Sequence, residues 1–295
     1  MKIPILCGPT ASGKSAFALQ LAQKIGGEII SCDSAQIYRE CDIVTAKPTR
    51  QERESVPHHL LDICNPNERF SAMLWAHAAA KTASEIVARG KIPVICGGTG
   101  FYLRALLQPE NLAAPAPDET LRAHLETRLK GEGRAVLLDE LREFEPEIAQ
   151  KIGEGDDYRL VRALQIALQK ARGDAILEAP QWNFETQIFA LEWPRAELYR
   201  RIETRVDEML RAGALEETRN LREKWGENAP ALGAVGYKQL LPVLENPARL
   251  PEAVALWKQA TRNYAKRQMT WFRHQTPAIW LDARCEISEI LQQIQ

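Results

Sequence analysis

The sequence predicts an α/β protein in which helices cover a parallel sheet and an all-helical unit interrupts the sheet-forming chain. Over the first hundred residues, short apolar runs alternate with helical patterns, as is typical of repeated βα units. From residue 118 to about 172 the pattern is helical throughout and carries no strand signal. A strand-like run at 187–191 then resumes the sheet pattern, so we expect the helical stretch to be an insertion.

The individual elements follow from the periodicity of the apolar residues. Four short apolar runs predict the first strands, at residues 3–6, 28–31, 60–63 and 93–96. Helical patterns in this half of the chain run from the end of the first turn to about residue 25, and over residues 71–89. Beyond the strand at 187–191, long polar helices are expected at 195–224, 236–244 and 251–272.

Prolines mark the border between the alternating strand and helix pattern and the helical stretch. Pro109, Pro115 and Pro117 punctuate a linker that leads into the helical stretch. We therefore expect a core unit formed by residues 1–110 and 185–295, with a helical insertion at 111–184.

Composition limits the classes of protein that the chain can belong to. With 295 residues, 45% of them hydrophobic and 26% charged, the chain can build a sizeable core. The formal net charge of −1 excludes a globally basic protein, so any nucleic-acid contact must come from local clusters of charge. The six cysteines show no C-x-x-C pairing, which favours reduced, structural thiols. Without a signal peptide or about 18 uninterrupted apolar residues, we expect a cytoplasmic protein with no membrane anchor.

The segment GPTASGKS after the first apolar run matches the phosphate-binding pattern G-x-x-x-x-G-K-[ST] in full. Its residues are Gly8, Pro9, Thr10, Ala11, Ser12, Gly13, Lys14 and Ser15. In such a loop, backbone N–H groups and a helix N-terminus surround an anionic group, Lys14 adds a positive charge, and Ser15 can ligate Mg²⁺. The strand before the loop and the helix after it indicate a P-loop NTPase-like sheet.

The loop alone does not identify its ligand, because a diphosphate of any origin fits the same set of donors. Most such loops hold ATP or GTP, which makes an ATP-binding kinase or an NTPase the default interpretation. A convincing Walker B motif, an apolar run that ends in aspartate, is missing, although Leu60-Leu61-Asp62 is a weak candidate. The sequence therefore predicts a phosphate-binding loop without a clear motif for nucleotide hydrolysis.

Two further turns are expected at the carboxyl edge of the sheet, where α/β proteins bind ligands. Gly97-Gly98-Thr99-Gly100 follows the run at 93–96, and Asp33 follows the second run, beside the phosphate loop if the two strands are neighbours. A carboxylate there could coordinate Mg²⁺ through water, cap a following helix, or act as a general base. The adjacent His58 and His59 lack the spacing of a zinc pair, which favours structural, hydrogen-bonded histidines.

Several blocks, in this order, resemble the sequences of tRNA dimethylallyltransferases, also called tRNA isopentenyltransferases. They are GPTASGKS at 8–15, DSAQIY at 33–38, TAKP at 45–48, PHHLLD at 57–62, GGTGFY at 97–102, AVGYK at 234–238 and TRNYAKRQMTWF at 261–272. The likeness extends over essentially the whole chain, and its ordered blocks beyond the phosphate loop make coincidence implausible.

The resemblance implies that the phosphate loop holds the diphosphate of dimethylallyl diphosphate. The dimethylallyl group would pass to the exocyclic N6 amine of the adenosine on the 3′ side of the anticodon, in tRNAs that read codons starting with U. An adenine amino group is a poor nucleophile, so a carboxylate that removes its proton has a clear task, and we expect Asp33 to be that base. Lys14, the loop amides and Mg²⁺ at Ser15 would neutralise the leaving diphosphate.

The resemblance also implies roles for further residues. Thr99 would contact the target nucleotide, and Arg205 the diphosphate, unless Arg205 lies on a solvated helix face as its arginine neighbours are expected to. The residues implied to contact tRNA are Asp33, Ser34, Ala35, Gln36, Thr99, Arg122, Tyr158, Arg159, Leu160, Val161, Arg162, Gly236, Tyr237 and Lys238. The target base would have to leave the anticodon-loop stack, as in base-flipping enzymes. The likeness suggests a monomer.

A cluster of cations and aromatic residues near the carboxyl end supports an RNA partner. Its members are Trp257, Lys258, Arg262, Tyr264, Lys266, Arg267, Trp271, Phe272 and Arg273, with no acidic residue among them. Cations neutralise phosphates and aromatic rings stack on unpaired bases, which is typical of proteins that bind loop RNA. On an amphipathic helix, we expect the aromatic side chains to be core and the cations to contact phosphates.

Three other functions stay open at this point. An adenylate isopentenyltransferase would use the same grip and base on free AMP, although it would need neither the helical insertion nor the basic helix. A P-loop small-molecule kinase would consume ATP. A non-catalytic RNA-binding NTPase switch would show nucleotide-dependent affinity for tRNA without forming any product.

Overall fold

A computed structural model describes residues 2–294 of the chain. The chain forms two compact units, one comprising Met1–Leu107 and Pro180–Gln295, the other Gln108–Ala179. Each unit has a hydrophobic core of its own. The borders of the second unit lie close to the predicted insertion limits of 111 and 184. Within the described residues, no helix combines the length and the apolar character that crossing a bilayer requires.

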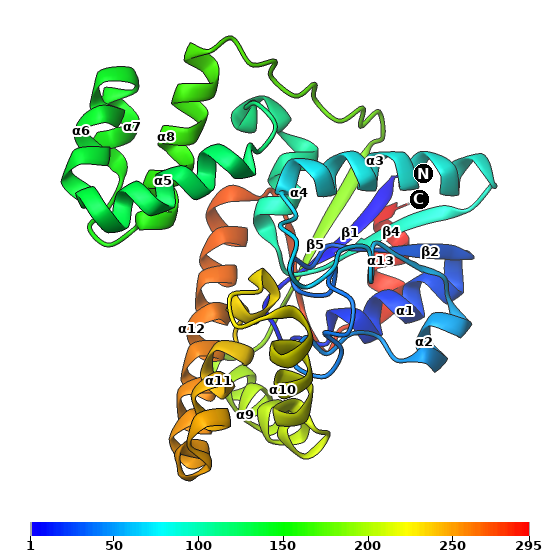
Figure 1. The fold of residues 1–295 in the computed structure, drawn as a ribbon. Coiled ribbons are helices and arrows are strands. Elements are labelled where there is room, and N and C mark those ends of the chain that lie inside the picture. The colour runs from blue at the N-terminus through cyan, green and yellow to red at the C-terminus, as the bar shows by residue number, and fades with distance from the viewer. Residues whose placement is uncertain (1, 295) are drawn as a thin grey trace. The chain divides into compact units, whose positions relative to one another are not determined.

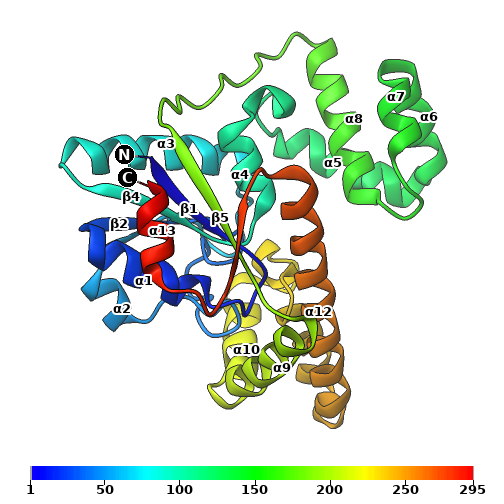
Figure 2. The same cartoon turned by 180° about the vertical axis from the view of Figure 1, so that it is seen from behind.

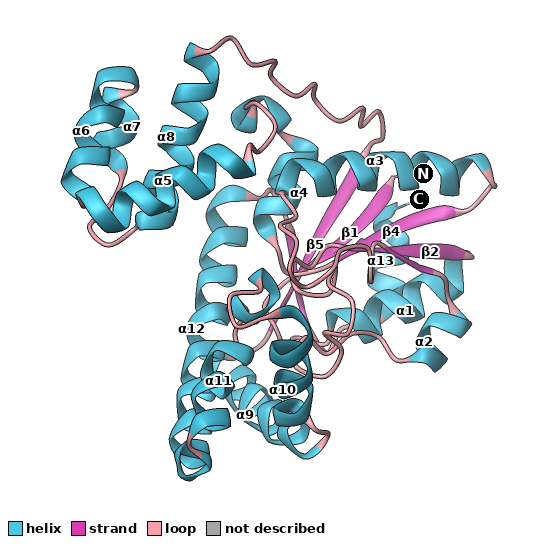
Figure 3. Ribbon diagram, in the orientation of Figure 1, coloured by secondary structure: helices cyan, strands magenta, loops and turns pink. Residues whose placement is uncertain are grey.

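A parallel sheet forms the centre of the first unit (Figures 1 and 3). Across the described residues its six strands run in the order β3-β2-β4-β1-β5-β6, and every pairing is parallel. The strands are β1 (Ile3–Cys7), β2 (Gly27–Ser31), β3 (His58–His59), β4 (Ile92–Cys96), β5 (Thr186–Glu192) and β6 (Ile279–Asp282). Because all strands are parallel, the turns that follow β1, β2 and β4 lie at one edge of the sheet.

Helices cover both faces of this sheet, as seen from the front and from behind (Figures 1 and 2). Helix α1 (Lys14–Ile25) packs Phe17 and Leu21 against strand residues such as Leu6, and α13 (Ile287–Ile294) joins the same core. On the other face lies α3 (Ala72–Ala88), whose Trp75 is fully buried and donates its indole N–H to the Ser31 carbonyl oxygen at 2.9 Å. Strand side chains are apolar on both sides because both sides are covered.

The remaining helices of the first unit carry the segments that approach the carboxyl edge of the sheet. They are α2 (Arg50–Ser55), α4 (Gly100–Leu107), α9 (Arg195–Arg211), α10 (Ala214–Trp225), α11 (Tyr237–Glu245) and α12 (Leu250–Gln275), with short 3-10 turns at Pro230–Gly233 and Pro247–Arg249. Contacts pair α11 with α12, α12 with α9, and α10 with α11, so helices α9, α10, α11 and α12 form one bundle.

The second unit is built from helices and contains no strand among its described residues (Figure 3). A 3-10 turn at Pro109–Leu112 precedes α5 (Glu119–Glu132), α6 (Arg134–Phe144), α7 (Pro146–Lys151) and α8 (Asp157–Ala171). Leucines such as Leu125, Leu137, Leu141 and Leu164 are fully buried at its centre. The helical nature predicted for residues 118–172 is confirmed.

Most predicted elements are present, and the exceptions have physical causes. The predicted strand at 60–63 is wrong: β3 is only His58–His59, and the backbone at Leu60 and Asp62 takes φ angles of 60° and 57°, which a strand does not tolerate. The single helix expected over 195–224 is two helices separated at Gly213. Strand β6 and helix α13 were not predicted.

Candidate active site

The predicted phosphate loop connects β1 to α1 and lines a pocket of about 270 Å³. Gly13 and Ser15 face this pocket, and Lys14 begins α1 with its side chain buried. The Lys14 ammonium donates a hydrogen bond to the Pro9 carbonyl oxygen at 3.3 Å. Burial lowers the pKa of Lys14, while nearby Cys96 and Asp33 act to raise that pKa. A buried cation in the first turn of a helix, together with the free N–H groups of that turn, favours binding of a phosphate group.

Two side chains that follow β5 in the sequence donate hydrogen bonds to the phosphate loop. The indole N–H of Trp193 donates to the Ser12 carbonyl oxygen at 2.9 Å, and the Arg201 guanidinium donates to the Ala11 carbonyl oxygen at 2.9 Å. The same guanidinium lies 4.6 Å from the centre of the Trp193 ring. Ala11 takes a left-handed φ of 64°, a strained value that these contacts hold in place.

Gln268 of α12 joins the phosphate loop to the glycine-rich turn after β4. Its amide oxygen accepts a hydrogen bond from the Thr10 N–H at 2.8 Å, and its amide nitrogen donates to the Gly98 carbonyl oxygen at 2.8 Å. A Cβ atom at position 98 would lie 2.2 Å from that nitrogen, so this close approach requires a glycine. Gln268 therefore fixes the distance between the two loops.

Asp33 follows β2 and lines the same pocket as the phosphate loop. Its Oδ1 accepts hydrogen bonds from the backbone N–H groups of Ala35 at 2.9 Å and Gln36 at 3.3 Å. These bonds orient the carboxylate in a turn, and no helix begins here, so the alternative role of a helix cap is wrong. The premise that β1 and β2 are neighbours is also wrong, because β4 lies between them. Asp33 nevertheless interacts electrostatically with Lys14.

Arg205 of α9 reaches this pocket instead of lying on a solvated helix face. Burial lowers the pKa of Arg205, and the nearby Asp33 carboxylate acts in the opposite direction. Because a guanidinium stays protonated in proteins, Arg205 adds a second, partly buried positive charge near Lys14. The structure thus brings together Lys14, Asp33 and Arg205, three residues from distant parts of the sequence.

Thr99 connects the turn after β4 to the turn after β2. Its hydroxyl oxygen accepts a hydrogen bond from the Ser34 N–H at 3.0 Å, and its own N–H donates to the Cys32 carbonyl oxygen at 3.2 Å. The Tyr264 hydroxyl of α12 also interacts with the Thr99 side chain, and burial raises the pKa of Tyr264 well above its usual range. Thr99 lies beside Asp33 in this network, next to the pocket that Tyr264 lines.

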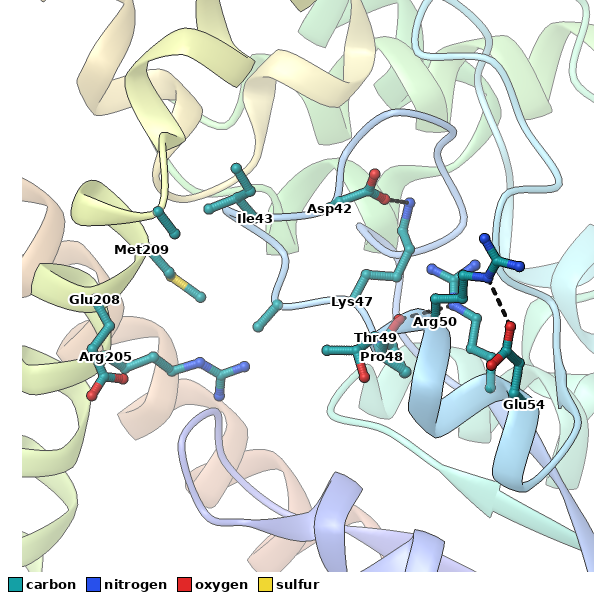
Figure 4. A pocket seen from close by; sticks show the side chains of 13 residues that line it. Asp42, Ile43, Lys47, Pro48, Thr49, Arg50, Glu54, Arg205, Glu208 and Met209 are labelled. Carbon is teal, nitrogen blue, oxygen red and sulfur yellow. Dashed lines mark hydrogen bonds and ion pairs between the residues drawn. The ribbon is translucent and has the colours of Figure 1, made fainter.

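A second, wider cavity of about 960 Å³ opens on the far side of the segment 42–54 (Figure 4). Ala46, Lys47, Pro48 and Arg205 line both cavities, so the two adjoin. In Figure 4, Ile43 points toward Met209 of α9 across the opening, while Asp42 and Lys47 form an ion pair with each other at 2.7 Å. Its lining combines apolar side chains such as Ile43 and Met209 with charged ones such as Arg205 and Glu208.

The residues of the weak Walker B candidate have a structural role. Asp62 accepts hydrogen bonds from the Lys47 ammonium at 2.6 Å and from the Arg53 guanidinium at 2.7 Å. Each oxygen of the Asp62 carboxylate thus accepts a hydrogen bond from a cation, which ties Asp62 to the segment that contains Lys47 and Arg53. His59 contacts the Glu28 carboxylate at 2.7 Å and His58 contacts the Val56 carbonyl oxygen at 2.8 Å, so both histidines are hydrogen-bonded, as predicted. His58 also lines the pocket that contains Lys14 and Asp33.

Among the described residues, no group of three His, Cys, Asp or Glu side chains is arranged to hold a metal ion. Mg²⁺ does not need such a group, because water and substrate phosphates supply most of its oxygen ligands. Ser15 and Asp33 both line the pocket and offer the oxygen donors that Mg²⁺ prefers. The residues present therefore fit a magnesium ion held together with a diphosphate.

The residues predicted to contact tRNA differ in exposure. Ser34, Tyr158, Arg159 and Lys238 are exposed, and Asp33, Ala35, Thr99 and Arg162 are partly exposed. Leu160 and Val161 lie in the core of the helical unit, Tyr237 in the core of the first unit, and Gly236 and Gln36 are buried. Side-chain contacts from Leu160, Val161 and Tyr237 to RNA are therefore corrected to packing roles.

Arg122 belongs to a small cluster at the surface of the helical unit. The residue is 6% exposed, and its guanidinium donates to Glu126 at 2.9 Å. It also lies 4.8 Å from the centre of the Tyr158 ring, which is 65% exposed. Arg122 thus orients an exposed aromatic ring and has little surface of its own to offer.

The cations and aromatic residues on α12 have different environments. Trp257 and Phe272 are buried, as predicted, whereas Tyr264 lines the pocket. Lys258, Arg262 and Arg273 form ion pairs with Asp207, Glu203 and Glu192. Lys266 and Arg267 are exposed, so the expectation of phosphate contact applies best to these two.

Comparisons with known proteins identify a family that this chain matches over most of its length. The family model described as IPP transferase matches residues 36–275, and the model described as isopentenyl transferase matches residues 1–66. The tRNA dimethylallyltransferase of an Exiguobacterium species is 41% identical over 282 residues, covering 95% of this chain and 90% of that protein. That of Geobacter metallireducens is also 41% identical, covering 99% and 96%.

Solved structures show the same relationship. The tRNA isopentenylpyrophosphate transferase of Bacillus halodurans superposes with a TM-score of 0.72 at 35% identity, covering 99% of this chain and 94% of that one. A eukaryotic dimethylallyltransferase acting on tRNA superposes with a TM-score of 0.74 at 28% identity, covering 96% and 74%. Matches at this identity and coverage establish that the chain belongs to the tRNA dimethylallyltransferase family of enzymes.

Proposed function

We propose that this protein transfers a dimethylallyl group from dimethylallyl diphosphate to the N6 amine of the adenosine on the 3′ side of the anticodon. The tRNAs that read codons starting with U are the proposed acceptors, and N6-dimethylallyladenosine is the product. The observation that carries the proposal is the convergence of Lys14, Arg205 and Asp33 on one pocket. Two cations suit a diphosphate leaving group, and one carboxylate suits an amine that must lose a proton.

The phosphate loop and Arg205 would bind the donor and stabilise its departure. As the allylic C1–O bond breaks, negative charge accumulates on the diphosphate oxygens. Lys14, Arg205 and the loop line the pocket in which that charge would lie, so they would stabilise it. Within Gly8 to Ser15, Pro9 has no N–H, and the N–H groups of Thr10 and Ser12 donate to Gln268 and Pro9, so the other amides would supply the backbone part of this grip.

Ser15, with Asp33 through water, would hold Mg²⁺ against the diphosphate. When bound, the ion adds charge neutralisation at the leaving group. The remaining ligands would come from the diphosphate and from water, as is usual for Mg²⁺ at phosphate sites.

Asp33 would act as the general base. As the new bond forms between N6 and C1, a proton leaves N6 for the Asp33 carboxylate, and the diphosphate departs with the electrons of the broken C–O bond. Oδ1 of Asp33 is held by the N–H groups of Ala35 and Gln36, which orients the carboxylate for this step. Thr99, which contacts Ser34 and Tyr264, would contact the target nucleotide.

The acceptor adenosine must leave the anticodon-loop stack to reach a carboxylate inside a pocket. Exposed groups would hold the surrounding RNA, through phosphate contacts and stacking. In the helical unit these are Tyr158, Arg159 and the partly exposed Arg162; in the first unit they are Ser34, Lys238, Lys266 and Arg267. We propose a monomer that acts in the cytoplasm, as the resemblance to the family suggests.

A direct assay tests the proposal. Purified protein is incubated with Mg²⁺ and radiolabelled dimethylallyl diphosphate, together with either unmodified tRNA bearing an adenosine next to the anticodon or free AMP. Label should appear in the tRNA at that adenosine and be absent from AMP. Label in AMP alone would reassign the acceptor to a mononucleotide. ATP hydrolysis without any transfer would contradict prenyl transfer altogether.

A further inference from the structure

Glu217 of α10 binds three consecutive backbone N–H groups of a distant segment. Its Oε2 accepts from Asp42 at 2.8 Å and from Ile43 at 2.7 Å, and its Oε1 accepts from Val44 at 3.0 Å. The Tyr237 hydroxyl donates a fourth hydrogen bond to Oε1 at 2.6 Å. Residues 42–47, which we name the strap, are thus held by a single carboxylate that comes from more than 170 residues away.

These bonds are of a strong kind. Hydrogen bonds to an ionised carboxylate are shorter and stronger than neutral ones, and four of them use most of its lone pairs. Burial, together with Cys41 and Glu217, raises the pKa of Tyr237 well above its usual range, so its hydroxyl keeps the proton that it donates. A Cβ atom at Gly236 would lie 2.4 Å from a Val44 methyl carbon, so the chain before Tyr237 packs directly on the strap.

The other side of the strap is tied to the proposed base. The Gln36 amide nitrogen donates to the carbonyl oxygens of Thr45 at 3.1 Å and Ala46 at 3.2 Å. The Gln36 backbone N–H in turn donates to Oδ1 of Asp33. Ala46 takes a left-handed φ of 48°, which persists only where surrounding contacts hold it.

The strap also forms part of the wall of the site. Ala46 and Lys47 line the pocket that contains Lys14 and Asp33, and Asp42 and Ile43 line the wider cavity opposite Arg205 (Figure 4). A shift of the strap would therefore change the shape of the donor pocket and the support of Asp33 together.

We infer that Glu217 is a positioning residue, which clamps the strap through the N–H groups of residues 42–44 and so fixes the wall of the donor pocket. The Gly236-Tyr237-Lys238 block then serves the reaction through the Tyr237 bond to Glu217, and Lys238 alone is left to contact RNA. This inference rests on the proposed function, because it assigns the clamp to donor binding. Misplacement of a wall by about 1 Å is enough to change catalysis substantially.

The test compares Glu217→Gln with Glu216→Gln, an exposed neighbour that pairs with Arg219 and does not touch the strap. Hydrogen exchange of the free protein should be faster at the amides of residues 42–44 in Glu217→Gln, because an amide side chain cannot accept all three bonds. The KM for dimethylallyl diphosphate should rise about tenfold, while the KM for tRNA stays within about twofold. Glu216→Gln should match the wild type in each measurement.

A purely structural role for Glu217 predicts a different pattern. It would lower the fraction of active enzyme, and therefore the apparent kcat, with both KM values unchanged, and that outcome would overturn the inference. Unchanged exchange at residues 42–44 would overturn it as well. If Glu217→Gln does not fold, Tyr237→Phe carries the test, because it removes one of the four bonds and should raise the donor KM by about threefold.

Binding of inorganic diphosphate with Mg²⁺, measured by calorimetry, separates failure of this inference from failure of the proposed function. Should the wild type bind diphosphate but transfer no dimethylallyl group, the proposed function fails. The clamp is then judged by whether Glu217→Gln weakens diphosphate binding and speeds exchange of the strap, neither of which requires turnover.

Discussion

The Lys47 ammonium lies 2.6 Å from the Asp62 carboxylate, and the Lys47 side chain is only 1% exposed. Burial alone would raise the pKa of Asp62, but hydrogen bonds from Lys47 and Arg53 outweigh burial and hold that pKa below its ordinary value of 3.8. A carboxylate whose pKa is lower in the folded state stabilises the fold above the unfolded-state pKa. This contribution is lost as the pH falls from about 4 through the folded-state pKa.

We therefore expect Asp62→Asn to flatten the acid side of the stability profile. The free energy of unfolding, measured with urea between pH 3 and pH 7, should depend less on pH below about 4 than in the wild type. Glu54→Gln, in an exposed pair with Arg50, serves as the control. Asp62→Asn should keep prenyl transfer; loss of transfer at unchanged stability would instead indicate a metal-binding role for Asp62.

Asp33→Asn should separate proton removal from the local fold. Asparagine keeps an Oδ1 that accepts from Ala35 and Gln36, so the turn is preserved, whereas its amide cannot take the proton. We expect kcat to fall by roughly 10²–10⁴ with donor KM changed by less than about threefold, from single-turnover and steady-state assays. Asp33→Ala, which also releases the turn, should be worse. A kcat near the wild-type value in Asp33→Asn would exclude Asp33 as the base.

Arg205→Gln should weaken both donor binding and the chemical step. The change removes a partly buried positive charge that shares the pocket with Asp33 and the phosphate loop. Loss of one group that stabilises developing charge typically lowers kcat by about 10²–10³. The matched control is Arg200→Gln, an exposed residue on the same helix that pairs with Glu197. Equal effects of the two variants would return Arg205 to a helix-surface role.

Gln268→Met should disconnect the two loops at nearly constant side-chain volume. The Thr10 N–H and the Gly98 carbonyl oxygen would each lose a buried partner, at a cost of about 1–3 kcal/mol in unfolding free energy. We expect kcat/KM for the donor to fall by about tenfold or more. Gln259→Met, on an exposed position of α12, should leave both quantities unchanged. Normal donor kinetics in Gln268→Met would show that the bridge is dispensable.

Lys266→Ala and Arg267→Ala should weaken tRNA binding without affecting the donor. Both side chains are exposed on α12, and each phosphate contact contributes about 0.7–0.9 to the slope of log K against log salt. The double variant should therefore reduce that slope by roughly 1.4–1.8, measured by filter binding over a range of salt concentrations. Arg273→Ala, whose side chain pairs with Glu192, should change the slope least.

The fold was predictable where a sequence pattern depends on one segment alone. Apolar runs predicted β1, β2, β4 and β5, and apolar periodicity predicted α3 and α12 to within a few residues. The run at 60–63 misled because Leu60 and Asp62 adopt left-handed backbone angles that tertiary contacts impose. Apolar character predicted the burial of Leu60 but could not distinguish a buried turn from a strand.

The site was predictable where a motif fixes its own geometry. The phosphate loop carries its strand, turn and helix with it, and Asp33 and Thr99 follow strands that end at the same edge. Trp193 and Gln268 were missed, because they act through hydrogen bonds to backbone atoms that no local pattern specifies. The family resemblance implied an RNA contact at Tyr237, but the Tyr237 side chain is buried and its hydroxyl donates to Glu217.

The hydrogen bonds of Gln268 affect how the phosphate loop folds while the chain is being synthesised. Thr10 leaves the ribosome early, but its partner is 258 residues further along, and β5, which pairs with β1, follows the helical unit. At synthesis rates of about 5–20 residues per second, the phosphate loop therefore waits roughly 13–50 s for the helix that fixes it. A truncated translation product that ends before α12 will lack that support, so an unfinished enzyme cannot hold its donor as the finished one does.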